Sequence, residues 1–249
     1  MTLKIKIALA AVIVAAYLVF VIALTPAALL VEHSKLPKGL ALGEVSETIW
    51  SPQISAARYQ GVTVNQISAD VSPWSLLALS PAAEVKFGSR LSDGPEGQGY
   101  LALRRDQVEI TDFTVQMPAG EIAPLLPLPI ELDAFGQAEL TIDELTLAGN
   151  QCVSAKGRLT WQRAAVNAFE QSIELGSFKG EISCQQGKLA VKVLPDNRLG
   201  LQYTALLGLD GRVSGQGYLT PGNNFPAQLR DTLPFIGNPD AQGRYELKF

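Results

Sequence analysis

The amino-acid sequence predicts a mainly β protein behind a single N-terminal transmembrane helix. Two observations carry this prediction. An uncharged, apolar run of 25 residues extends from Ile7 to Val31, and short segments of alternating apolar and polar residues fill most of the chain after it. Glycines and prolines lie between these segments, which indicates turns between antiparallel strands with a few short helices. With 47% hydrophobic and 18% charged residues, the 249-residue chain can bury a core.

The apolar run predicts a transmembrane helix over residues 7–31. As a helix it would be about 37 Å long, enough to cross a hydrocarbon core of about 30 Å. Lys4 and Lys6 precede the run and a segment of mixed charge follows it. The positive-inside bias therefore places residues 1–6 in the cytoplasm and residues 32–249 in the periplasm. A cleaved signal peptide is the alternative, although its apolar core usually has only about 7–15 residues.

Beyond the apolar run, the alternation predicts strands that become more regular after Gly136. A weak repeat begins at Gly136, Gly157, Gly180, Gly211 and Gly243, where glycine is followed by a polar and then an apolar residue. This repeat indicates either hairpins that each open with glycine or glycines that simply mark turns. In the first half of the chain the expected strands cover residues 45–49, 54–59, 62–67, 85–87, 100–103 and 108–115.

Two short helices are expected between the strands. Residues 72–79 begin with Ser72 as a cap and Pro73 at the first helical position. Residues 119–126 form the second, which Pro124 keeps short. Residues 92–99 are rich in glycine and are expected to form a hairpin loop.

The chain has two cysteines, Cys152 and Cys184, both on the side predicted to be exported. In an oxidising periplasm such a pair is most simply a structural disulfide. Closing a loop of this length contributes roughly 3–4 kcal/mol in the loop-entropy model. The alternative is two buried free thiols. A zinc site would need more ligands than these two cysteines provide.

Composition excludes several functions. Beyond residue 31 the chain carries 18 Lys and Arg against 24 Asp and Glu, and no basic cluster. Because nucleic-acid binding needs a stripe of positive charge, we expect no nucleic-acid partner. His33 is the sole histidine and lies next to the predicted membrane segment. It is therefore the one candidate for a histidine base, and a poor one.

No catalytic signature is found, so we expect no enzymatic activity, no cofactor and no metal site. Gly97-Gln-Gly99 lacks the third glycine of a dinucleotide fingerprint. A glycosidase would need two facing carboxylates. However, the adjacent Asp143 and Glu144 are expected on opposite faces of a strand, and Glu139 with Thr141 on its solvated side. The three tryptophans, Trp50, Trp74 and Trp161, fall in apolar patterns and are expected in the core.

The order of several motifs resembles the type II secretion system protein N family, also called general secretion pathway protein N. The resemblance covers nearly the whole chain, with the basic N-terminus, the apolar segment and the two cysteines. Glu47 departs from the pattern, because the family usually has glycine there. The other matching segments are residues 36–37, 44–51, 72–77, 123–129 and 233–245.

The resemblance implies a non-catalytic, single-pass component of the inner membrane that takes part in exporting folded proteins from the periplasm across the outer membrane. It implies other type II secretion system components as partners. The family is similar to the AsmA-like superfamily, which implies a curved antiparallel sheet shaped like a half-pipe after the anchor. The alternative function is a groove protein that binds or passes apolar, lipid-like ligands between envelope membranes.

Overall fold

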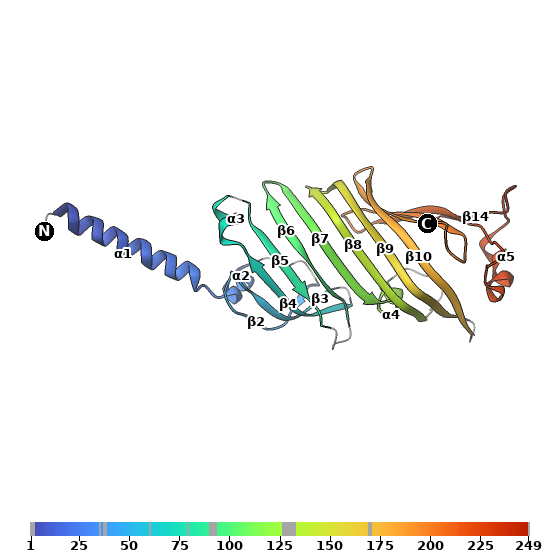
Figure 1. Ribbon diagram of the computed structural model, residues 1–249, viewed down its shortest axis with the longest axis horizontal. Helices are drawn as coiled ribbons and strands as arrows, with labels where there is room; N and C mark the ends of the chain where they lie inside the picture. Colours follow the sequence, from blue (N-terminus) through green and yellow to red (C-terminus); the bar gives the residue numbers. More distant parts are fainter. Residues whose placement is uncertain are drawn as a thin grey trace.

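One antiparallel sheet makes up most of the fold (Figure 1). The computed structural model describes residues 3–34, 36, 39–59, 61–78, 80–89, 94–125, 133–168 and 171–248. Within these residues the sheet has 14 strands, and from β3 onward each pairs with the next strand of the chain. This arrangement confirms the mainly β, antiparallel prediction. Figure 1 shows the first helix projecting from one end of the sheet and the last helix at the other end.

The strands lengthen toward the middle of the sheet. At the first edge β1 and β2 both pair with β3, on either side of Gly43 and Glu44. The strands are β1 (Ala41–Leu42), β2 (Val45–Ser46), β3 (Gln53–Tyr59), β4 (Val62–Val71), β5 (Ala82–Phe87), β6 (Glu96–Arg104), β7 (Gln107–Pro118), β8 (Asp133–Ala148), β9 (Gln151–Ala168), β10 (Gln171–Gln185), β11 (Lys188–Val193), β12 (Leu201–Leu207), β13 (Val213–Leu219) and β14 (Tyr245–Lys248).

Short helices occupy three connections between strands. α3 (Pro73–Leu77) joins β4 to β5, and α4 (Ala119–Ile122) with the 3₁₀ turn η1 (Ala123–Leu125) follows β7. The two expected helices are therefore present but shorter, and residues 79 and 126 of the expected ranges lie outside the described part. The connection from β13 to β14 carries η2 (Ala227–Thr232) and α5 (Leu233–Ile236).

The N-terminal segment forms two helices, which corrects the single helix predicted over residues 7–31. α1 (Leu3–Ala23) ends before Pro26, and α2 (Ala27–His33) begins after it. Pro26 has no N–H to continue the helix and disfavours helical backbone at Thr25. Pro26 instead adopts extended backbone (φ −66°, ψ 138°) and bridges to Thr48.

No helix in the described part of the chain combines the length and the apolar character that crossing a membrane requires.

Side-chain alternation gives the sheet one apolar and one polar face. On the apolar face, Ile142, Gly157, Ile182, Val191 and Ala205 are consecutive partners across β8 to β12. On the polar face the neighbouring row runs from Thr141 through Arg158, Glu181 and Lys192 to Thr204. The core therefore lies on one side of a curved sheet.

The connections at one end of the strands cover part of the apolar face. Ala119 and Ala123 of the α4–η1 segment pack against Ala134 and Trp161. Phe225 and Leu233, from the β13–β14 connection, form a second cluster with Leu219. A third cluster around Ile173 and Phe178 is packed by Leu199 and Leu229. These clusters join the connections to strands β8 through β14.

Several expected strand boundaries need correction. Gly136, Gly157 and Gly180 lie inside β8, β9 and β10, so these glycines do not open strands, whereas Gly211 and Gly243 do lie in turns before β13 and β14. Gly97 and Gly99 belong to β6 and not to the expected loop over residues 92–99, of which residues 92 and 93 lie outside the described part. Of the strand expected over residues 45–49, only Val45–Ser46 is a strand, namely β2.

Candidate functional site

Glu139 and Thr141 lie on the polar face of β8, as predicted. Gln116 Nε2 donates a hydrogen bond to Glu139 Oε2 at 3.2 Å, and Thr141 is paired with Arg158 on β9. Both residues are half-buried among polar neighbours. Such contacts are typical of a hydrogen-bonded sheet face.

Asp143 and Glu144 are not on opposite faces, so that expectation was wrong. A β-bulge between Ile142 and Glu144 adds one residue to β8. Ile142 and Leu145 are consequently both buried although they are three residues apart. Asp143 Oδ1 lies 3.7 Å from Arg158 on the polar face. Both carboxylates therefore share the solvated side of β8.

His33 is the last residue of α2, and its side chain lies outside the described part. Among the described residues, no group of three or more His, Cys, Asp or Glu side chains is arranged to hold a metal ion.

Glycines allow close approach on the apolar face. A Cβ added to Gly157 would lie 2.5 Å from the carbonyl oxygen of Thr141 on β8. At Gly217 an added Cβ would overlap the backbone and ring of Tyr203 on β12. The Tyr203 side chain is partly buried at this close approach, and its burial raises the pKa of the phenol above its ordinary value. Six glycines inside strands share this face: Gly97, Gly99, Gly157, Gly180, Gly215 and Gly217. Their missing side chains leave room for neighbouring strands to curve inward.

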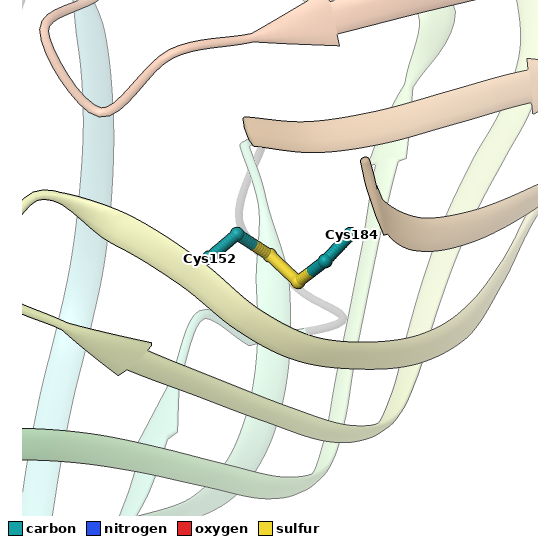
Figure 2. The surroundings of a disulfide bond; sticks show 2 residues. All are labelled: Cys152 and Cys184. Atoms are coloured by element: carbon teal, nitrogen blue, oxygen red, sulfur yellow. A yellow bond between two sulfur atoms is a disulfide. The ribbon is translucent and has the colours of Figure 1, made fainter. Parts of the chain in front are cut away.

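Cys152 and Cys184 are joined by a disulfide on the inner side of the curved strands (Figure 2). Their Cα atoms are 5.6 Å apart, and Cys152 is buried. Pairing between β9 and β10 ends at Gly157 and Ile182, before either cysteine is reached. The disulfide thus links β9 and β10 where their backbone pairing has stopped.

Two adjoining hollows lie across β2 to β7, with volumes of about 460 and 500 Å³. Gln66 and Ser68 line both hollows, and Gln66 has a positive φ of 52°. Lys86 lines the second hollow, and it donates a hydrogen bond to the Glu84 carboxylate; this hydrogen bond and the negative charge of Glu84 raise the pKa of Lys86. The lining also contains the amides and hydroxyls of Ser46, Gln53, Ser55, Gln98, Thr114 and Gln116, together with two carboxylates and a few apolar residues.

Trp50 joins α1 to the sheet. Its indole Nε1 donates a hydrogen bond to the carbonyl oxygen of Ile22 at 3.2 Å, in the last turn of α1. Its own carbonyl accepts a hydrogen bond from Val71 N at the end of β4, at 2.7 Å. Ala27 N donates to Glu47 O and Ile49 N to Thr25 O, each at 3.0 Å. The end of α1 is therefore held by several hydrogen bonds.

The other two tryptophans have different environments. Trp161 is half-buried, stacks on Phe178 with ring centroids 5.4 Å apart, and donates from Nε1 to Phe135 O at 2.9 Å. Trp74 on α3 has 78% of its surface exposed, which corrects the expectation of a core residue. Ser72 precedes α3 without a side-chain cap, and Ser75 Oγ bonds to its carbonyl instead.

At the far end of the sheet, Asp240 organises the turn before β14. Its Oδ1 accepts hydrogen bonds from Gln242 N and Arg244 N, and its Oδ2 lies 2.8 Å from Arg244 Nε. The backbone hydrogen bond from Arg244 holds the pKa of Asp240 below its ordinary value. The Arg244 guanidinium also lies 4.5 Å from the ring centre of Tyr218. On nearby α5, Phe235 is 90% exposed.

The sequence did not predict the joint, that is, the hydrogen-bonded connection between α1 and the sheet at Trp50, nor the turn organised by Asp240. The signal for the turn was present, because Asn238-Pro239-Asp240 followed by Gly243 is a pattern typical of turns. The joint had no comparable signal, since Trp50 and Ile22 are 28 residues apart and meet only in the folded chain.

Comparison with known proteins gives a consistent result. The family model described as "Type II secretion system (T2SS), protein N" matches residues 38–248. A type II secretion system protein N from Aeromonas hydrophila is 32% identical over 259 positions, covering 99% of this chain and 98% of its own. Proteins of the same name from Vibrio cholerae and Klebsiella pneumoniae are 28% and 29% identical, covering 88% and 97% of this chain and 88% and 94% of their own. No solved structure matches.

Proposed function

The chain belongs to the type II secretion system protein N family, and we propose that it serves this machine by binding other components, not by catalysis. The match over residues 38–248 is the observation that carries this conclusion. It makes the protein a component of the type II secretion system. That the protein has no catalytic role is our own proposal. It is supported by the carboxylates of the polar face, because Asp143 pairs with Arg158 and Glu139 accepts a hydrogen bond from Gln116.

We infer that the uncharged apolar segment of residues 7–31, which contains most of α1, anchors the chain in the inner membrane as a single pass, with residues 1–6 in the cytoplasm and residues 32–249 in the periplasm. The large apolar side chains of α1 support this, because their exposed fractions run from 47% at Val21 to 68% at Tyr17. A helix that is apolar on all sides needs an apolar environment, and the sheet does not cover it. The lysines at positions 4 and 6 support the orientation.

Protease treatment of spheroplasts tests this topology. We expect added protease to digest the β-rich domain while the inner membrane stays intact. Intact cells, whose outer membrane excludes the protease, are the control. A domain protected in spheroplasts would contradict the orientation, and a mature N-terminus near residue 28 would show that the segment is cleaved.

Partner binding is the use that we propose for the sheet. Sheet edges can accept a strand from a partner, and β14 forms the edge farthest along the chain from α1. We also propose kinship with the AsmA-like superfamily, supported by the curved sheet behind an apolar helix. No observation favours the lipid-groove alternative, because most residues that line the two hollows are polar or charged.

Photocrosslinking in cells tests the partner claim. A photoreactive residue at Phe235, which is 90% exposed, should capture another type II secretion component. The matched control places the same residue at Ala190, which is fully buried and should capture nothing. Capture that is unchanged in a strain lacking the other secretion components would contradict the proposal.

A further inference from the structure

Exposed apolar side chains gather on the two short helices beside the end of α1. On α2, Leu29 and Leu30 are 48% and 58% exposed. On α3, Trp74 and Leu76 are 78% and 40% exposed. Each of the two helices therefore presents large apolar side chains to solvent, which is unusual for a surface that stays in water.

Hydrogen bonds place α2 and α3 near the end of α1, where Trp50 joins α1 to the sheet. α2 starts directly after Pro26, which bridges to Thr48. Trp50 binds Ile22 of α1 through its indole and Val71 through its carbonyl. Trp74 follows Val71 by three residues, which limits their separation to about 11 Å even for extended chain. Figure 1 shows α2 and α3 at the same end of the sheet as α1.

The chain around α3 also lacks charge. Residues 71–83 contain no Asp, Glu, Lys or Arg. Transfer of this segment into the boundary layer of a bilayer would therefore desolvate no ionised group. Tryptophan favours this layer because its ring is apolar and its N–H can still reach water or a lipid headgroup.

We propose that Leu29, Leu30, Trp74 and Leu76, here called the collar, insert into the interfacial layer of the inner membrane around the exit of α1. This inference rests on the proposed membrane anchorage of α1. A lipid surface is the occupant because the collar lies at the same end of the sheet as α1, whose large apolar side chains are exposed, and because residues 71–83 around α3 carry no charge. The collar then fixes the near end of the sheet against the bilayer, in place of a flexible tether.

Tryptophan quenching by brominated lipids tests the collar. The full-length protein is reconstituted in phosphatidylethanolamine–phosphatidylglycerol vesicles, with bromine near the headgroup end of the acyl chains. The difference between the parent and Trp74→Phe gives the emission of Trp74. We expect brominated lipid to remove at least about half of that emission. In the control, Trp74→Phe with Phe235→Trp, the emission of the new tryptophan should be unaffected by lipid bromine.

The outcomes separate the collar from the anchor. Vesicle flotation first reports whether the chain is inserted. If the protein floats with the vesicles but Trp74 is not quenched, the collar is wrong and the anchor stands. If the protein does not float, the anchor fails and the collar with it. A photoreactive residue at position 74 that captures a protein in cells, and not lipid, would also overturn the collar.

Discussion

Glu47 holds a backbone conformation that glycine adopts more easily. Its φ is 64°, and its carbonyl accepts the hydrogen bond from Ala27 N at 3.0 Å. The turn therefore keeps the geometry for which glycine is suited, although a glutamate stands there. A side chain at positive φ costs about 1 kcal/mol.

Replacing Glu47 should test this strain. We expect Glu47→Gly to raise the free energy of unfolding by up to about 1 kcal/mol, because the strain is removed and only some backbone entropy is lost. Glu47→Val should lower it, since β-branched residues avoid positive φ. Chemical denaturation of the purified protein measures both. A stabilising Val or a destabilising Gly would contradict the assignment.

The inward curve of the sheet depends on small residues at specific positions. Gly157→Val places methyl groups against the carbonyl oxygen of Thr141, 2.5 Å from the site of the new Cβ. We expect a loss of about 1–3 kcal/mol, the usual range for overpacking. Gly222→Ala is the matched control, because an added Cβ there meets nothing within 4 Å. Equal melting temperatures for the two variants would argue against close strand approach at Gly157.

At the scale of the elements, the Cys152–Cys184 disulfide holds β9 and β10 together where their backbone pairing ends. We expect Cys184→Ser to lower stability by about 2–4 kcal/mol, since a closed loop of 32 residues is released in the unfolded chain. Urea denaturation measures the change. The parent should show no reactive thiol when unfolded without reductant, and two after reduction. Two reactive thiols before reduction would contradict the bridge.

The turn before β14 should respond to acid. Because the pKa of Asp240 is lowered in the folded state, its contribution is present above the ordinary value of 3.8 and is lost as pH falls through the lower folded value. The nuclear magnetic resonance signal of the Arg244 Nε–H, which binds Asp240 Oδ2, should shift over this window below pH 3.8. In Asp240→Asn the shift should disappear. A shift unchanged by the substitution would assign the titration to another group.

Alternation along the chain predicted most strands, because side chains on a sheet must point to one of two faces. The bulge after Ile142 was not predictable, since one extra residue leaves the local pattern almost unchanged yet moves Glu144 to the polar face. Mid-strand glycines such as Gly157 were read as strand starts for a related reason. Their role depends on a neighbouring strand that the local sequence does not contain.

The break between α1 and α2 shows a different limit. Pro26 gave a signal for a helix boundary, but the apolar run continues through it to Val31. Hydropathy therefore favoured one helix. In the structure, hydrogen bonds from Ala27 N to Glu47 O and from Ile49 N to Thr25 O stabilise the break between the two helices. Such long-range contacts cannot be read from the composition of the segment itself.

At the scale of the whole molecule, the sheet extends from α1 at one end to β14 at the other, and we propose that it acts as a binding surface (Figure 1). The Trp50 hydrogen bond to Ile22 joins the sheet to the proposed anchor. A component built in this way would act by position and contact. Its loss should therefore impair the assembly that carries folded cargo, and leave the cargo's own export into the periplasm unchanged.

The location of secreted cargo in a deletion strain tests this account most directly. We expect the cargo to collect in the periplasm, folded and cleaved of its own signal, and the intact gene to restore secretion. The extent of the block measures how far the machine depends on this component. Normal secretion in the deletion strain would contradict the account, and normal secretion with altered outer-membrane lipid would favour the lipid-groove function instead.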